Sequence, residues 1–187
     1  MPCKIIGINR VRAFLRLHGL SLVLLIITTL IAAKIYGFSA EVSTQSEETS
    51  QGVSFFIASL VFEGFCEKTP TEQNELVLSI VPFIRKLAHF LVYAALGFFS
   101  FLTVERYRNE IKKPKRRVVS FAVSLMFCLL YATSDEIHQL FVEGRSGSVA
   151  DVLLDFLGSI SGAVFALLLP MIFASVLNKR KNRQTLQ

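Results

Sequence analysis

The chain has 187 residues, of which 52% are hydrophobic, and its mean hydropathy is +0.54. These values exclude an ordinary soluble domain, and several uncharged runs of bilayer-spanning length place the chain among integral membrane proteins. The formal net charge of +6 does not indicate a nucleic-acid partner, because the basic residues stand almost entirely beside the apolar runs, as membrane topology requires.

The first apolar run extends from Leu17 to Ala33 and follows a basic segment without acids. Its length, and the lysine that directly follows it, favour a retained transmembrane helix over a cleaved signal peptide. Residues 39–51 then become rich in Ser, Thr, Gln and Glu, which predicts a solvated loop. Residues 54–62 are apolar but too short to span a bilayer, so they predict an interfacial or re-entrant helix.

The segment before the second span is less regular. Residues 63–75 are polar and contain Thr69-Pro70, which predicts a helix start because proline is favoured in the first turn. Residues 76–84 form another short apolar piece, which Pro82 interrupts.

Three further uncharged runs have the length of a membrane span: 87–104, 118–134 and 156–177. With the first run they predict an all-α integral membrane protein with four transmembrane helices and one or two short interfacial helices. The expected segments are an N-terminus with the first span (1–38), an extracytoplasmic loop (39–79), a core of three spans (80–178) and a basic tail (179–187).

Charge is distributed unequally between the two sides of this predicted arrangement. The N-terminus, the 105–117 segment and the C-terminus together carry 15 basic and two acidic residues, whereas the rest of the chain carries five basic and 12 acidic residues. Lys and Arg accumulate in cytoplasmic segments of membrane proteins. We therefore expect a multi-pass protein of the plasma membrane with both termini in the cytoplasm.

This topology predicts that the ends of three spans bring ionisable side chains to the outer leaflet. Helical spacing places Lys86, His89 and Tyr93 on one face, and the same argument applies to Asp135, His138 and Gln139. Ionisable residues at membrane depth are costly and usually functional. The expected functional cluster comprises Lys86, His89, Asp135, Glu136, His138, Gln139, Arg145, Asp151 and Asp155.

Two glycines follow the aspartates of the last span at helical spacing. Asp151, Asp155, Gly158 and Gly162 repeat at steps of four, three and four. Small residues at this spacing allow another helix to approach closely. The pattern predicts that the face with the two carboxylates points into the protein.

Three separated blocks occur in order along the chain. The blocks are Lys86-Leu-Ala-His89-Phe90 with Tyr93 and Gly97, Asp135-Glu136-Ile-His138-Gln139-Leu-Phe141 with Gly144-Arg145, and Asp151-Val-Leu-Leu-Asp155-Phe-Leu-Gly158 with Gly162. Together these blocks resemble the VanZ-like family of bacterial membrane proteins, and the resemblance covers roughly residues 80–170. Many members of this family have Asn at the position of Asp155. The family name comes from an accessory protein associated with teicoplanin resistance. The resemblance therefore implies a role at the bacterial cell envelope, with glycopeptide resistance as one candidate.

The residues leave several hypotheses open. In the first, which we favour, the cluster binds a lipid or cell-wall headgroup, with Arg145, Lys86 and Arg85 as donors. In the second, it forms a membrane-embedded hydrolase or transferase in which His89 or His138 is the base and the carboxylates orient it or hold a divalent metal. The enzyme hypothesis lacks a recognisable nucleophile or metalloprotease motif. In the third, the polar groups only hold helix ends together.

No cofactor is expected, and the three cysteines have no metal-type spacing. The sequence assigns no acid, base or nucleophile within the cluster, and it predicts no oligomeric state. A proton-coupled transporter is disfavoured because no polar face runs through the middle of the spans.

Overall fold

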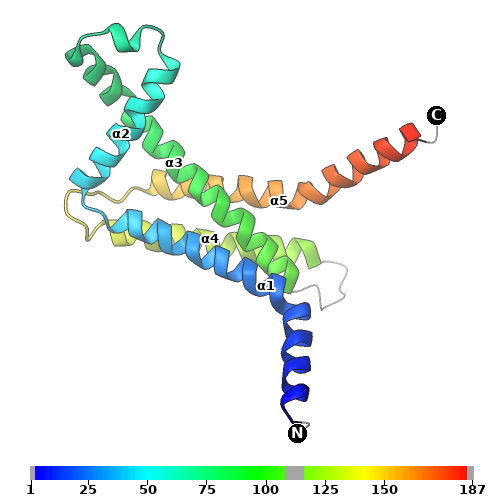
Figure 1. The fold of residues 1–187 in the computed structure, drawn as a ribbon. Helices are drawn as coiled ribbons and strands as arrows, with labels where there is room; N and C mark the ends of the chain where they lie inside the picture. Colours follow the sequence, from blue (N-terminus) through cyan, green and yellow to red (C-terminus); the bar gives the residue numbers. More distant parts are fainter. Residues whose placement is uncertain (1–2, 108–115, 185–187) are drawn as a thin grey trace.

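The computed structural model describes residues 3–107 and 116–184, and it describes side chains over residues 18–42, 46–107 and 117–170. The remaining residues include most of the predicted basic 105–117 segment. In the described part, the chain forms five α-helices and one 3-10 helix (Figure 1). These are α1 (Cys3–Ala40), α2 (Ser43–Val61), η1 (Phe65–Glu67), α3 (Pro70–Tyr107), α4 (Arg116–Gln139) and α5 (Val149–Gln184).

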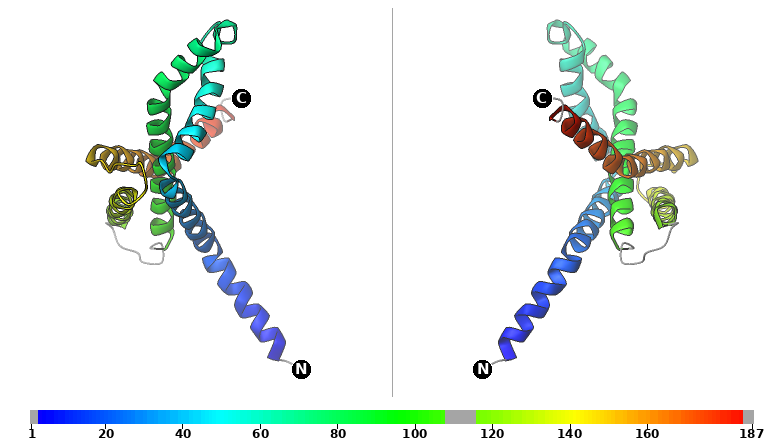
Figure 2. Two further views of the ribbon diagram at one scale, coloured as in Figure 1. Left: turned by 90° about the vertical axis from the view of Figure 1, so that its left-hand side faces the viewer. Right: turned by 90° about the vertical axis from the view of Figure 1, so that its right-hand side faces the viewer.

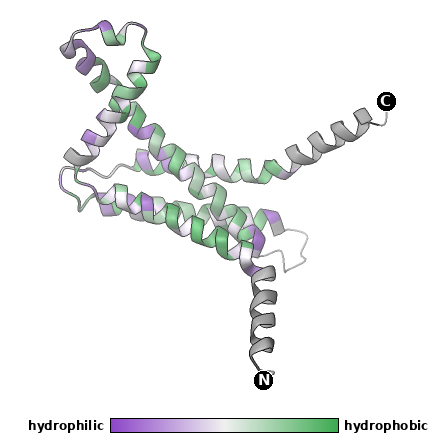
Figure 3. Cartoon of the chain, in the orientation of Figure 1, coloured by the Kyte–Doolittle hydropathy of each residue, from purple (hydrophilic) through white to green (hydrophobic). Residues whose placement is uncertain are grey.

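Four of these helices are long and apolar enough to cross a membrane. The apolar stretches are His18–Ala40 in α1, Pro70–Tyr107 in α3, Arg117–Gln139 in α4 and Val149–Pro170 in α5. Hydrophobic residues run along these helices (Figure 3), and many large apolar side chains on them are exposed. Exposed apolar side chains suit a lipid environment. A helix can cross that environment because its backbone hydrogen bonds are satisfied within the helix. The prediction of an all-helical protein with four spans is confirmed.

The predicted solvated loop over residues 39–51 is wrong for most of its length. Helix α2 begins at Ser43 and continues to Val61, so it joins this polar segment to the apolar 54–62 piece. Helix α2 packs on α3, and tertiary packing supplies most helical stability, which accounts for the helical conformation of the polar stretch.

The 76–84 piece is also not a separate element. Helix α3 is continuous from Pro70 to Tyr107 and runs through Pro82. Proline removes one helical hydrogen bond, but membrane helices tolerate it where neighbouring groups compensate. The predicted helix start at Thr69-Pro70 is confirmed. The backbone N–H and hydroxyl of Thr69 donate to the carboxylate of Glu72 at 2.9 and 2.7 Å, and the Glu72 N–H donates weakly back to the hydroxyl at 3.4 Å, as in a capping box.

Helix α3 is the central element and contacts α1, α2, α4 and α5. Its N-terminal part pairs with α2 in a hairpin that extends away from α4, and its C-terminal part packs among the other spans (Figure 2). Helices α3 and α5 pack most closely. A Cβ atom added at Gly158 or Gly162 of α5 would overlap the backbone of Phe90 or Ala94, and one at Gly97 of α3 would overlap the backbone of α5. The close approach predicted from the glycine spacing is confirmed.

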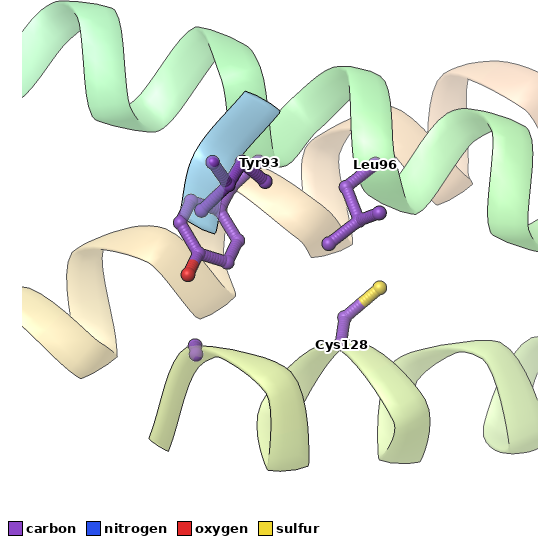
Figure 4. Packing of buried hydrophobic residues seen from close by; sticks show 5 residues of the cluster. Tyr93, Leu96 and Cys128 are labelled. Atoms are coloured by element: carbon purple, nitrogen blue, oxygen red, sulfur yellow. The ribbon is translucent and has the colours of Figure 1, made fainter. Parts of the chain in front are cut away.

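A buried apolar cluster lies where α3 and α4 meet. Tyr93 and Leu96 of α3 face Cys128 of α4 (Figure 4), and Ile35 of α1 and Ala132 of α4 complete the cluster. None of these five residues is more than 3% exposed. This packing holds the Tyr93 ring in place and directs its hydroxyl toward the end of α4.

Candidate functional site

Two side chains of α3 meet two carboxylates of α5 in register. The Nζ atom of Lys86 lies 3.6 Å from Oδ1 of Asp151, and Nδ1 of His89 lies 3.7 Å from Oδ2 of Asp155. Lys86 and His89 are three residues apart, and Asp151 and Asp155 are four apart, so each pair occupies adjacent turns of its helix. Both carboxylates face α3, as the sequence predicted, but only Asp155 is buried, whereas the side chain of Asp151 is 39% exposed.

A third contact continues this series from α3 to α4. The hydroxyl of Tyr93 donates to Oδ2 of Asp135 at 3.2 Å, and Nε2 of Gln139 donates to the same oxygen at 3.4 Å. Tyr93 and Asp135 are buried. We use the name polar ladder for the set of three cross-helix pairs, Lys86–Asp151, His89–Asp155 and Tyr93–Asp135.

Burial increases along the polar ladder. The side chain of Lys86 is 61% exposed, that of His89 is 28% exposed, and Tyr93 is completely buried. Within the described part of the chain, Oδ1 of Asp135 and Oδ1 of Asp155 are buried without a hydrogen-bond partner. An orphaned buried acceptor costs about 1–3 kcal/mol, so these two oxygens mark a place where a donor from a ligand or water would be stabilising.

Glu136 connects the end of α4 to the start of α5. Its Oε1 accepts the backbone N–H of Ser148 at 2.6 Å. The hydroxyl of Ser148 in turn accepts the N–H of Ala150 at 3.2 Å, which is the role of a helix N-cap. One carboxylate therefore fixes the point at which α5, with its two aspartates, begins.

Arg145 lies on the connection between α4 and α5 and reaches α1. Its Nη2 donates to the carbonyl of Phe38 at 2.8 Å, near the end of α1, where helical carbonyls lack internal partners. Its Nε and Nη1 are buried and make no hydrogen bond to the described residues. Burial and the neighbouring charge of Arg85 lower the pKa of Arg145 from its ordinary value. Arginine remains charged in proteins, so Arg145 offers two unused donors and a positive charge.

These elements enclose a polar cleft of about 460 Å³ between α2, α3, α4, α5 and the α4–α5 connection. Seven of the nine residues in the predicted functional cluster line it: Lys86, His89, Glu136, Gln139, Arg145, Asp151 and Asp155. Asp135 lies behind Gln139 and contacts it directly. The structure thus brings together residues that the sequence separates widely, and their function stays a prediction.

His138 does not join the polar cleft. Its ring stacks on Tyr36 of α1, with the ring centroids 4.7 Å apart. Asp135 and Gln139 are about one helical turn apart and contact each other. His138, three residues after Asp135, is rotated about the helix axis by about 60° relative to Asp135. His138 therefore faces α1, and the prediction that it lies on the same face as Asp135 and Gln139 is wrong.

Sequence reasoning missed the contribution of α2 to the polar cleft. Glu47 and Gln51 line it, although both fall in the segment that was predicted to be a loop. Their spacing of four residues was the available signal, because it places them on one face of a helix. Tyr93 was noted only for its helical spacing, and its hydrogen bond to Asp135 makes it part of the polar ladder.

The described residues provide no group of three or more His, Cys, Asp or Glu side chains that could hold a metal ion. Cys128 lies in the apolar cluster and Cys66 is an exposed residue of η1. We therefore assign no metal ligand among the predicted residues.

Four apolar spans, three of which line a polar cleft, define a multi-span integral membrane protein. The family model described as VanZ/LLP1 matches residues 21–173, and the chain belongs to this family. The match extends beyond the three sequence blocks and includes the first span and the α2–α3 hairpin. Comparisons with curated proteins and with solved structures gave no match.

Proposed function

We propose that the polar cleft binds the charged headgroup of a lipid or of a cell-wall component at the outer leaflet of the plasma membrane. The distribution of basic residues supports this orientation, because both termini and the 105–117 segment are strongly basic and basic segments remain in the cytoplasm. In this orientation the end of α4 and the start of α5 face the outside of the cell.

One observation carries the proposal: the polar cleft contains polar atoms that the described protein leaves unsatisfied. Nε and Nη1 of Arg145 are unused donors, and Oδ1 of Asp155 is an unused acceptor. Guanidinium groups recognise phosphate and carboxylate through paired hydrogen bonds. A bound headgroup would satisfy these atoms and compensate for the cost of burying them.

The family is named for glycopeptide resistance, and we extend the proposal to a contribution to teicoplanin resistance. A protein that binds an envelope headgroup in the outer leaflet acts where an extracellular antibiotic meets the membrane. This part of the proposal rests on membership of the VanZ/LLP1 family.

A membrane-embedded hydrolase or transferase is the second candidate, and the His89–Asp155 pair favours it. An imidazole with Nδ1 facing a buried carboxylate is oriented by that carboxylate, and its other nitrogen can then transfer a proton. The polar cleft is large enough for a substrate beside His89.

The test compares Arg145→Ala with Glu143→Ala at equal protein abundance. Glu143 is an exposed charged residue two positions away on the same connection, so it is a matched control. We expect Arg145→Ala to lose about tenfold in affinity for a headgroup such as glycerophosphoethanolamine and to lower teicoplanin resistance in cells, whereas Glu143→Ala changes neither. Equal effects of the two substitutions would contradict the proposal.

A further inference from the structure

A second pocket, of about 190 Å³, adjoins the polar cleft between α1, α2 and α3. We call it the apolar pocket, because most of its surface is formed by apolar atoms. Its hydrophobic lining residues include Ile35, Phe38, Val53, Ile84, Ala88 and Val92. Its volume is below the 300–1,000 Å³ typical of pockets that enclose a whole drug-sized ligand, so it suits a segment of one hydrocarbon chain.

The two pockets share three residues. Arg85, His89 and Arg145 line both the apolar pocket and the polar cleft. A ligand that filled both would therefore have to place an anionic group at the two arginines, directly after its apolar part. Glu41, which also lines the apolar pocket, lies close enough to Arg145 to favour its charged form.

The lining of the polar cleft also contains four carboxylates, which are Glu47, Glu136, Asp151 and Asp155. Lys86 pairs with Asp151 and the Ser148 N–H with Glu136. Asp155 is 2% exposed and its Oδ1 has no partner among the described residues. A purely anionic headgroup would place negative charge near these carboxylates, which is unfavourable at short range.

We propose that the two pockets bind one phospholipid with a zwitterionic headgroup. One acyl chain enters the apolar pocket, the phosphate lies between Arg85 and Arg145, and the ammonium group faces Glu136 and Asp155. Arginine forks suit the phosphate, and the ammonium supplies the donor that the buried carboxylate oxygen lacks. This inference rests on the proposed headgroup binding and specifies its ligand.

Helix α2 borders both pockets and also carries exposed apolar side chains. Ser46, Thr49, Ser50 and Val53 of α2 line the apolar pocket, and Glu47 and Gln51 line the polar cleft. Residues Phe55, Phe56 and Leu60 of the same helix are exposed apolar side chains. The second acyl chain would remain among the surrounding lipids beside this exposed surface.

The test measures binding of three probes to detergent-purified full-length protein. The probes are short-chain phosphatidylethanolamine, short-chain phosphatidylglycerol and glycerophosphoethanolamine, which has the headgroup without acyl chains. We expect phosphatidylethanolamine to bind about tenfold or more tightly than either of the other two, a difference of about 1.4 kcal/mol. Phosphatidylglycerol binding as tightly as phosphatidylethanolamine would overturn the zwitterionic assignment.

Two substitutions fill the apolar pocket from different helices, Ala88→Phe from α3 and Val53→Phe from α2. Both residues are exposed at the pocket wall, so neither substitution needs to disturb the core. Ala122→Phe is the matched control, because Ala122 is an exposed residue of α4 outside both pockets.

Each filling substitution should weaken phosphatidylethanolamine binding about tenfold and leave the affinity for glycerophosphoethanolamine unchanged, while Ala122→Phe changes neither. Unfolding temperatures identify any variant that fails to fold, and the other filling substitution then decides. Unchanged phosphatidylethanolamine binding in the filled variants would overturn the acyl-chain site and leave headgroup binding intact. Failure of all three probes to bind the wild type would refute the binding of a lipid headgroup in the proposed function, and with it this inference.

Discussion

His89 of α3 and Asp155 of α5 face each other across the closest helix crossing in the described structure. The Nδ1 of His89 lies 3.7 Å from Oδ2 of Asp155. One turn beyond Asp155, Gly158 lies against the backbone of Phe90, the residue after His89. The absence of a side chain at Gly158 therefore sets the distance between the imidazole and the carboxylate.

The stability of the packing between α3 and α5 at Gly162 should be sensitive to the addition of a single methyl group. A Cβ atom at Gly162 would overlap the backbone of Ala94, so we expect Gly162→Ala to lower the free energy of unfolding by about 1–3 kcal/mol through overpacking. Gly37→Ala in α1 is the matched control because no atom lies within 4 Å of the added Cβ. It should be neutral or stabilising by up to about 1 kcal/mol. Unfolding in detergent micelles measures both, and equal effects would contradict the crossing.

The buried end of the polar ladder should contribute more to stability than a comparable tyrosine nearby. Tyr93→Phe leaves Oδ2 of the buried Asp135 with only the longer, 3.4 Å hydrogen bond from Gln139, and we expect this loss to cost about 1–3 kcal/mol. Tyr131→Phe is the control. Its hydroxyl donates to the carbonyl of Ala32 at 2.6 Å from a less buried position, and loss of that bond should cost about 0.5–1.5 kcal/mol. A larger effect for Tyr131→Phe in micelle unfolding experiments would contradict this order.

The proposed orientation can be tested with a native cysteine. Cys66 is an exposed residue of η1, on the side that we assign to the cell exterior. In a variant in which Cys3 is replaced by serine, a membrane-impermeant maleimide should label intact cells at Cys66. The buried Cys128 should stay unlabelled until the protein is unfolded, and Cys66→Ser should remove the signal. Labelling that requires cell lysis would reverse the proposed topology.

Metal analysis of detergent-purified protein tests the metal-assisted form of the enzyme candidate. We expect no stoichiometric divalent metal in the wild type, because the described residues bring together no three suitable ligand side chains. Glu136→Gln and Asp151→Asn serve as comparison variants. Near-stoichiometric metal in the wild type that is lost from both folded variants would support metal-assisted catalysis over headgroup binding.

The sequence predicts the parts of this site that depend on helical periodicity. The shared face of Lys86, His89 and Tyr93 and the close packing at Gly158 and Gly162 both follow from steps of three and four residues. The four spans follow from apolar run length. These properties belong to single helices, so they require no knowledge of their neighbours.

The features that the sequence does not predict depend on which helices become neighbours. The polar segment around Glu47 becomes helical because α2 packs on α3. His138 turns to Tyr36 because α1 lies beside α4. Local composition at Glu47 and local spacing at His138 are compatible with either outcome, and tertiary packing decides between them.

The gradient of burial along the polar ladder separates tolerance from constraint. At Lys86 and Asp151, exposure to solvent makes an ion pair worth little, so side chains there can be exchanged without loss of the fold. At Tyr93 and Asp135, a substitution removes a hydrogen bond from a buried polar atom, and no solvent is present to replace that bond. If the polar cleft binds a headgroup as we propose, its selectivity can change at the exposed Lys86–Asp151 pair while the buried Tyr93–Asp135 pair preserves the fold.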